Sequence, residues 1–165
     1  MKFLGWLYDL SLSAWIRESD WGHPIMLCFH AIGMAMVVGV VTTLAIRVAL
    51  DWPKGLLVES FSGLLRLARW GFLVNLASGV VLFVANAPSL TLNFTFQLKI
   101  ALIATGGLAV WALWRLLIGT PEKPVPQTGI FTLQAKLLSW LIIVFWLGAI
   151  VSGRYIAYTL QKVFV

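Results

Sequence analysis

IMLCFHAIGMAMVVGVVTTLAIRVAL, residues 25–50, is an apolar run whose basic residue, Arg47, comes only near its end. It exceeds the roughly 20 residues that an α-helix needs to cross the hydrocarbon core of a bilayer. Three further runs of similar character lie at about 70–87, 96–118 and 137–160. The sequence therefore predicts an all-α membrane protein, a single membrane domain (1–165) in which four transmembrane helices form a bundle.

The composition supports this class. Hydrophobic residues make up 61% of the 165 residues and charged residues only 11%, which is too little polar surface for a soluble globule of this size. The net charge of +6 then reports membrane topology, and we expect no nucleic-acid partner. A lone cysteine, Cys28, provides neither a disulfide framework nor a metal-finger spacing.

The first residues, about 2–18, predict an amphipathic helix lying in the membrane interface. Polar residues recur there at steps of about three, four and seven, while apolar residues lie largely elsewhere around the helix. Residues 56–69 mix Glu59, Arg66 and Arg69 with leucines, and we expect them to run along the opposite interface. The polar residues of the first segment are Lys2, Asp9, Ser13, Arg17 and Asp20.

Basic residues predict the orientation of the bundle. The side opposite the N-terminus carries seven of the twelve Lys and Arg residues, whereas the Asn86–Thr95 connection on the N-terminal side carries none. By the positive-inside rule, both termini are expected outside the cytoplasm. The seven residues are Arg47, Lys54, Arg66, Arg69, Arg115, Lys123 and Lys136.

Three ionisable residues, His30, Lys99 and Arg154, fall inside the predicted spans at a similar depth. At about 1.5 Å per residue, each lies roughly 5–9 Å below the extracytoplasmic boundary. A Lys or Arg at a helix centre costs about 2.5–3.5 kcal/mol on insertion scales, so such a residue usually faces a partner, a cavity or a bound group. Alternatively, Lys99 and Arg154 snorkel to lipid phosphates, and His30 bonds to a neighbouring helix.

A quinone is one ligand that suits these residues. Its carbonyl oxygens accept hydrogen bonds from imidazole, ammonium or guanidinium groups, so His30, Lys99 and Arg154 would serve a quinone without any second axial ligand. Gln97 and Trp146 are candidates for lining such a pocket, although both also suit ordinary packing.

A b-type haem is a second ligand, with His30 as its axial ligand and the basic residues near its propionates. Gly33, one turn from His30, leaves room either for a flat cofactor or for a close helix contact. The second axial ligand is missing, because His23 lies seven residues away on the same helix, about 10.5 Å along its axis. The histidine count therefore argues against a self-contained bis-histidine haem. A haem here would be five-coordinate, take an unusual second ligand, or receive its second ligand from another chain.

Copper is a third possibility. His23, Met26, His30 and Met34 are spaced by three, four and four residues, which places them along one helix face. Imidazole and thioether groups suit Cu(I). Methionine is also a common apolar filler of helices, so the stripe equally suits a packed core.

Four short stretches of the sequence carry a family resemblance that extends over nearly the whole chain. They are Ser19–Pro24, His30–Gly33, Phe94–Lys99 and Gly153–Tyr158. With them, the chain resembles an uncharacterised bacterial family of four-span inner-membrane proteins, a domain of unknown function. The resemblance implies a bacterial inner membrane and makes His30, Lys99 and Arg154 the positions that match the family's polar pattern, whereas His23 and the methionines depart from it. In layout the chain is also similar to b561-type cytochromes and copper-resistance membrane proteins, but it lacks the several helix-borne histidines of the former.

The sequence holds no phosphate-binding glycine loop, nucleophile elbow or His-Glu-x-x-His motif, so we do not expect an independent enzyme. The leading hypothesis is a small membrane subunit of an electron-transfer assembly, which binds quinone or haem in the extracytoplasmic leaflet. Its expected partners are the lipid bilayer and other membrane or periplasmic redox subunits, or further copies of itself. Copper(I) handling and a structural or assembly role without a cofactor are the alternatives.

Overall fold

The computed structural model describes residues 2–51, 58–118 and 131–161. Within these ranges the chain is helical with no strand, and four of its helices are long and apolar enough to cross a membrane. The expected all-α four-helix bundle is thus confirmed, and the chain is a multi-pass membrane protein. The four spanning helices are α3 (Gly22–Ala49), α4 (Val58–Ala85), α6 (Phe94–Ile118) and α7 (Leu133–Gln161).

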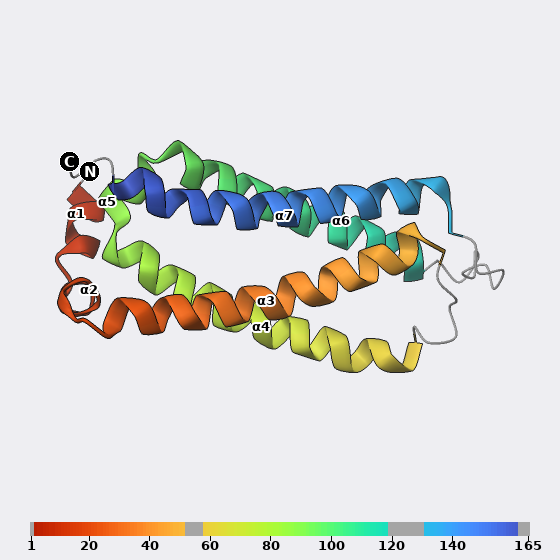
Figure 1. The fold of residues 1–165 in the computed structure, drawn as a ribbon, viewed down its shortest axis with the longest axis horizontal. Coiled ribbons are helices and arrows are strands. Elements are labelled where there is room, and N and C mark those ends of the chain that lie inside the picture. Colours follow the sequence, from red (N-terminus) through yellow and green to blue (C-terminus); the bar gives the residue numbers. More distant parts are fainter. Residues whose placement is uncertain (1, 52–57, 119–130, 162–165) are drawn as a thin grey trace.

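The four long helices form two pairs. Helix α3 packs along α4, α6 packs along α7, and contacts between α3 and α7 join the pairs (Figure 1). The buried core lies in the half of the bundle away from the N-terminus, where the ends of α3 and α6 meet the start of α7. Its members are Val37, Val38, Ala45, Val48, Ala109, Leu113, Phe131, Ala135, Ile142 and Trp146.

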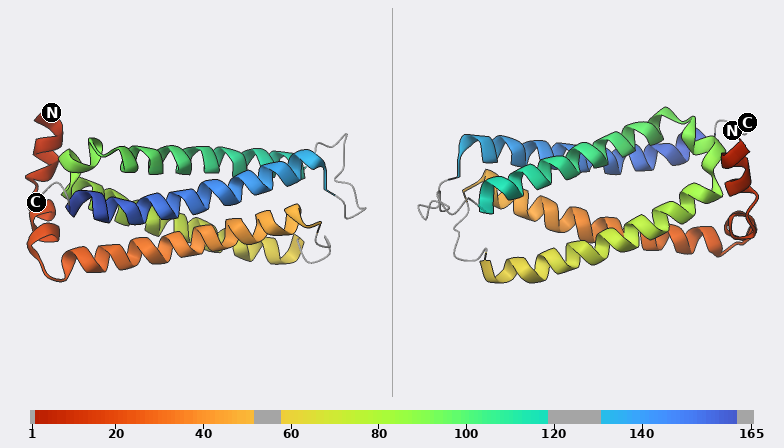
Figure 2. Two further views of the ribbon diagram at one scale, coloured as in Figure 1. Left: turned by 45° about the horizontal axis from the view of Figure 1, so that its top comes forward. Right: turned by 180° about the vertical axis from the view of Figure 1, so that it is seen from behind.

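Two short helices, α1 (Lys2–Tyr8) and α2 (Ser11–Glu18), lie across the other end of the bundle (Figure 2). The prediction of one continuous helix over residues 2–18 is therefore wrong. Leu10 adopts an extended conformation (φ −61°, ψ 141°) between the two helices. The hydroxyl of Ser13 donates to the carbonyl of Leu7 at 2.7 Å, which satisfies an acceptor in the last turn of α1. We call this end of the bundle the α1–α2 end.

The segment before the second span also differs from expectation. Helix α4 runs unbroken from Val58 to Ala85, so residues 58–69 continue the spanning helix, and the expectation that they run along the interface is wrong. Arg66 and Arg69 are exposed in its first half. Residues 56 and 57, like Lys54 and Lys123, lie outside the described residues. A third short helix, α5 (Ala87–Thr91), follows α4 and connects it to α6.

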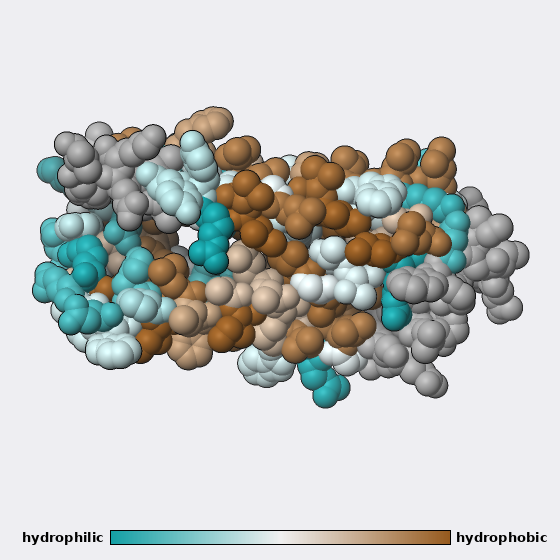
Figure 3. All heavy atoms as spheres, viewed as in Figure 1, coloured by the Kyte–Doolittle hydropathy of each residue, from teal (hydrophilic) through white to brown (hydrophobic). Residues whose placement is uncertain are grey.

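The outer surface of the long helices is largely apolar. Figure 3 shows apolar atoms over most of the middle of one face, and hydrophilic atoms gathered mainly at the α1–α2 end. Large hydrophobic side chains on every spanning helix are exposed, including Ile32, Leu76, Leu108 and Val144. Because such surface is stable only in hydrocarbon, these faces contact the lipid bilayer.

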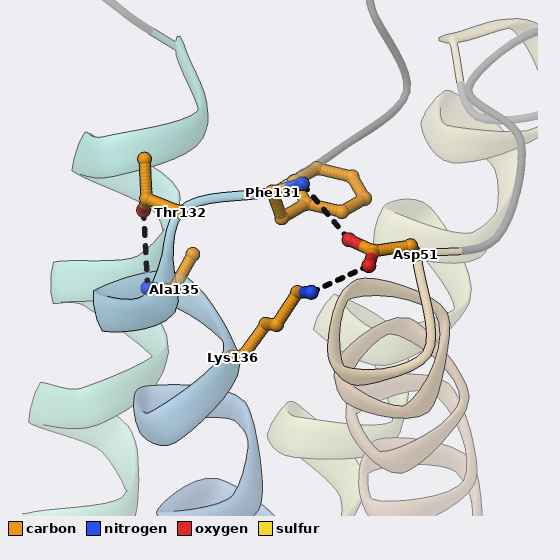
Figure 4. Close-up of polar contacts among 5 residues, drawn as sticks. All are labelled: Asp51, Phe131, Thr132, Ala135 and Lys136. Atoms are coloured by element: carbon orange, nitrogen blue, oxygen red, sulfur yellow. Dashed lines mark hydrogen bonds and ion pairs between the residues drawn. The ribbon is translucent and has the colours of Figure 1, made fainter.

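A polar clasp closes the end opposite α1 and α2 (Figure 4). The Lys136 ammonium forms an ion pair with Asp51, and the backbone N–H of Phe131 donates to the other carboxylate oxygen at 2.9 Å. The Thr132 hydroxyl accepts from the N–H of Ala135 at 3.3 Å, as an N-cap of α7 does. The clasp therefore joins the end of α3 to the start of α7.

Candidate functional site

His30 lies on the face of α3 that packs against α4. Its Nδ1 atom is 3.1 Å from the backbone carbonyl oxygen of Asn75 and 3.2 Å from the hydroxyl of Ser78. Gly79 leaves space for the ring, because a Cβ at that position would lie 3.1 Å from Cε1 of His30. Helix α4 thus holds the imidazole by one nitrogen and leaves the other, Nε2, directed elsewhere.

Lys99 reaches His30 from the other helix pair. Its Nζ atom, carried by α6, lies 3.4 Å from Nε2 of His30. Gly153 of α7 provides the space for the lysine, since a Cβ there would lie 3.2 Å from Nζ and 3.4 Å from Cε. We call these two residues the His30–Lys99 pair. The pair joins α3 of one helix pair to α6 of the other. It lies nearer the α1–α2 end of the bundle, where the core cluster has no member.

The hydrogen-bond partners assign the tautomer of His30. A backbone carbonyl can only accept, so the contact with Asn75 requires a proton on Nδ1. Ser78 cannot supply that proton, because its hydroxyl donates to the carbonyl of Val74 at 2.7 Å. In the neutral imidazole, Nε2 therefore carries a lone pair and accepts a hydrogen bond from Lys99.

Two positive charges at this distance are not compatible. Unit charges 3.4 Å apart repel by about 5 kcal/mol at an effective dielectric constant of about 20. An alkyl ammonium is intrinsically a much weaker acid than an imidazolium, so the proton stays on Lys99 and the His30 ring is neutral. The pair thus presents one hydrogen-bond acceptor and one cationic donor side by side.

Arg154 and Gly33 are not drawn into this contact. Arg154 follows Gly153 on α7, but its side chain is exposed. Gly33 is buried at the crossing of α3 and α4, where a Cβ would lie 2.7 Å from the carbonyl oxygen of Gly71. No flat cofactor fits on that side of Gly33, which instead serves close helix packing.

Gln97 and Trp146, the two further candidates for pocket lining, lie apart from each other. Gln97 is exposed and donates to the carbonyl of Thr91 at 2.9 Å. Trp146 is buried in the core, with its Nε1 atom beside Gly106 and without a hydrogen-bond partner among the residues that the structure describes. Trp146 belongs to the packing between α6 and α7.

The four residues of the copper stripe all lie on helix α3. His23 and Met26 are half-buried, whereas Met34 packs against the core cluster. In the described parts of the chain, no three His, Cys, Asp or Glu residues come together as a metal-binding group. The Lys99 ammonium beside Nε2 of His30 also opposes a cation at that nitrogen.

Two cavities lie elsewhere in the bundle. One, of about 70 Å³, is lined by apolar side chains of the long helices, including Val40, Leu65 and Leu113. The other, of about 450 Å³, is an open groove lined by Phe83, Thr91 and α6 residues such as Gln97. Neither is lined by His30, Lys99 or Arg154. Figure 3 shows an opening between α7 and the α3–α4 pair, bordered by hydrophilic atoms, in the half of the bundle that holds the His30–Lys99 pair.

Asn75 and Ser78 are the site residues that sequence reasoning missed. Both are polar residues inside an apolar span, three positions apart and followed by Gly79, so they share one helix face. That spacing is a usable signal for a polar contact between helices. It carries no indication of which residue on which helix will meet them.

Comparison with family models, with curated proteins and with solved structures finds no match for this chain. The fold and the site therefore define a class only, a four-span membrane protein with a histidine–lysine contact within the bundle.

Proposed function

We propose that this chain is a small membrane subunit that binds a quinone-type ring at the His30–Lys99 pair and takes part in electron transfer. The observation that carries the proposal is the 3.4 Å approach of Nε2 of His30 to Nζ of Lys99 between two helix pairs. Nζ of Lys99 can donate a hydrogen bond to an oxygen of the ring, and Nε2 of His30 can accept one from the hydroxyl of the reduced ring. The fatty tail of such a ligand also suits a site between helices whose outer faces are apolar.

The charge at Lys99 supports a bound polar ligand. An ammonium within a span is costly unless it has a partner. Among the described residues the only ion pair is between Asp51 and Lys136, at the opposite end of the bundle. The His30 nitrogen alone does not neutralise Lys99, so an oxygen-rich ligand would complete its environment.

The opening between α7 and the α3–α4 pair supports a route for the ligand (Figure 3). The core cluster and the clasp hold the helix pairs together in the other half of the bundle. For a ring to enter, the two helix pairs would thus need to move apart only towards the α1–α2 end, where few buried side chains join them. In this proposal the site faces the extracytoplasmic leaflet of a bacterial inner membrane, and other redox subunits supply or remove the electrons.

Haem remains a second candidate, favoured by one observation. Histidines that ligate metals usually donate their other ring N–H to a carbonyl or carboxylate, as His30 does to Asn75. Against this, Lys99 already occupies the region in front of Nε2, and the iron would need Lys99 or a partner chain for its sixth position.

Ligand analysis of the purified protein in lipid nanodiscs distinguishes between these functions. We expect extractable quinone or saturable binding of added decylubiquinone, and no Soret band in the absorption spectrum. His30→Gln and Lys99→Met should each weaken binding of the reduced form, decylubiquinol, at least tenfold, while Lys2→Met, on the exposed surface of α1, should not. A Soret band lost in His30→Gln would instead establish haem.

Absence of both quinone and haem would overturn the proposal. Stoichiometric copper that is lost in His30→Ala, Met34→Ala would then favour copper handling. A stable complex with a partner protein that survives His30→Ala would favour a structural or assembly role.

A further inference from the structure

The His30–Lys99 pair offers two different hydrogen-bonding groups to a ligand. Nε2 of His30 is an acceptor, because Asn75 holds the ring proton on Nδ1. Nζ of Lys99 is a donor, because it carries N–H groups both as an ammonium and as a neutral amine. The two atoms lie 3.4 Å apart, so a single ligand atom can approach both.

Ligand oxygens differ in what they can do at such a pair. A quinone carbonyl, a carboxylate or an ionised phosphate only accepts, so it can bond to Lys99 but directs lone pairs at the lone pair of Nε2. A hydroxyl both donates and accepts. Its O–H can donate to Nε2 of His30 while its oxygen accepts from Nζ of Lys99.

From this complementarity we infer that the site prefers the hydroquinone form of its ligand to the quinone form. The inference rests on the proposed function and adds the redox state of the ring that the site selects. The phenolic hydroxyl of the hydroquinone replaces the direct contact between Nζ and Nε2. The flexible lysine side chain moves aside, its N–H turns from Nε2 to the ligand oxygen, and the O–H donates to the freed lone pair of Nε2. Helix α4 sets this preference, because Asn75 and Ser78 determine which nitrogen of His30 carries the proton.

The tautomer itself can be measured without any ligand. Selective ¹⁵N-histidine labelling of the His23→Gln variant leaves His30 as the single labelled residue, since the chain has two histidines. At pH 8 we expect an N–H signal from Nδ1 and an unprotonated Nε2. A proton on Nε2, alone or together with one on Nδ1, would overturn the inference whatever ligand binds.

Binding of the two redox forms tests the preference directly. Decylubiquinone and anaerobically reduced decylubiquinol are titrated into the nanodisc-embedded protein. We expect the quinol to bind at least tenfold more tightly, which corresponds to a midpoint potential of the bound couple about 30 mV above that of the free couple. Equal binding, or tighter binding of the quinone, would overturn the preference and leave the proposed function standing. Failure of both forms to bind would overturn the proposed function.

Variants at His30 and Lys99 test which of the two nitrogens, Nε2 or Nζ, is responsible for the preference for the quinol. Lys99→Met should reduce binding of both forms, because both accept from Nζ. His30→Phe should reduce quinol binding and leave quinone binding within about twofold, because only the quinol donates to Nε2. An equal loss of affinity for quinol and quinone in His30→Phe would contradict this assignment. The His23→Gln protein serves as the control and should keep the quinol preference.

Discussion

Gly33 of α3 and Gly71 of α4 meet backbone to backbone. A Cβ at Gly33 would lie 2.6 Å from the backbone nitrogen of Asn75, and one at Gly71 would lie 2.5 Å from Cβ of Met36. Because Asn75 also supplies the carbonyl that bonds to His30, this close crossing sets the position of α4 relative to the imidazole. Packing of α3 on α4 and the geometry of the site are therefore coupled.

Gly33→Ala should destabilise the bundle, because the new methyl group would overlap the α4 backbone, which cannot rotate away. We expect the free energy of unfolding to fall by about 1–3 kcal/mol, measured by thermal unfolding in detergent. Gly39→Ala on the same helix is the matched control, since no atom lies within 4 Å of its Cβ position. It should be neutral or stabilising by up to about 1 kcal/mol. Equal stability of the two variants would contradict the crossing.

Gly153→Leu should separate Lys99 from His30 with little loss of stability. The added side chain would meet the far end of a flexible lysine, which can move, rather than backbone. We expect decylubiquinol binding to fall at least tenfold, while the unfolding temperature stays close to that of the wild type. Gly107→Leu on α6 is the control, because its Cβ position is open. Unchanged binding in Gly153→Leu would argue against Lys99 as a ligand-binding residue.

Acid should loosen the clasp through Asp51. The hydrogen bond from Lys136, and then that from the Phe131 N–H, hold the pKa of Asp51 below its ordinary value of about 3.9. A lowered pKa in the folded state means that the clasp contributes its full stability above that ordinary value. The contribution is lost as the pH falls through the lower, folded-state pKa.

Asp51→Asn isolates this contribution. Asp51 has a φ of 52°, a left-handed conformation that asparagine also tolerates, and the amide oxygen can still accept from Phe131. We expect the variant to be less stable than the wild type at pH 7, and the difference to shrink as the pH falls below the ordinary carboxyl pKa of about 3.9. Urea titrations of the nanodisc-embedded proteins at a series of pH values would measure this. If the difference in stability between the variant and the wild type did not change with pH, the ion pair would not be the source of that difference.

Arg17 should hold the N-terminal helices onto the bundle. Its Nη1 atom donates to the carbonyl of Tyr8 at 2.8 Å and to that of Ala85, the last residue of α4, at 3.1 Å. The guanidinium also lies 3.6 Å from the centroid of the Tyr8 ring. Arg17→Gln should speed hydrogen exchange over residues 2–18 by about tenfold or more, as expected for hydrogen bonds to a charged group worth about 1.5–3 kcal/mol. The exposed neighbour Glu18→Gln should exchange like the wild type.

Topology can be tested in a Cys28→Ser background. Ser11 on α2 and Leu133 at the start of α7 are exposed and lie at opposite ends of the bundle. With an extracytoplasmic N-terminus, a membrane-impermeant maleimide added to intact cells should label Ser11→Cys and spare Leu133→Cys. The reverse pattern would place the His30–Lys99 pair in the cytoplasmic leaflet.

Hydropathy and length were sufficient for the four spans. Each predicted span agrees with a helix to within a few residues at most ends, because a long apolar run has no stable alternative in a bilayer. The start of α4 was misplaced, since Arg66 and Arg69 suggested an interfacial segment. The interruption at Leu10 was also missed, because the polar spacing of residues 2–18 continues through it.

Sequence alone thus determined the class of protein, its four spanning helices and the similar depth of His30, Lys99 and Arg154. Only the tertiary structure decided which faces meet, and so which of these residues come together. The reason is physical: lipid tails are as apolar as a helix interior, so the sequence of a span carries little periodic signal for its packed face. Gly33 and Gly71 bring α3 onto α4, Gly153 makes room for Lys99, and Arg154 is left exposed.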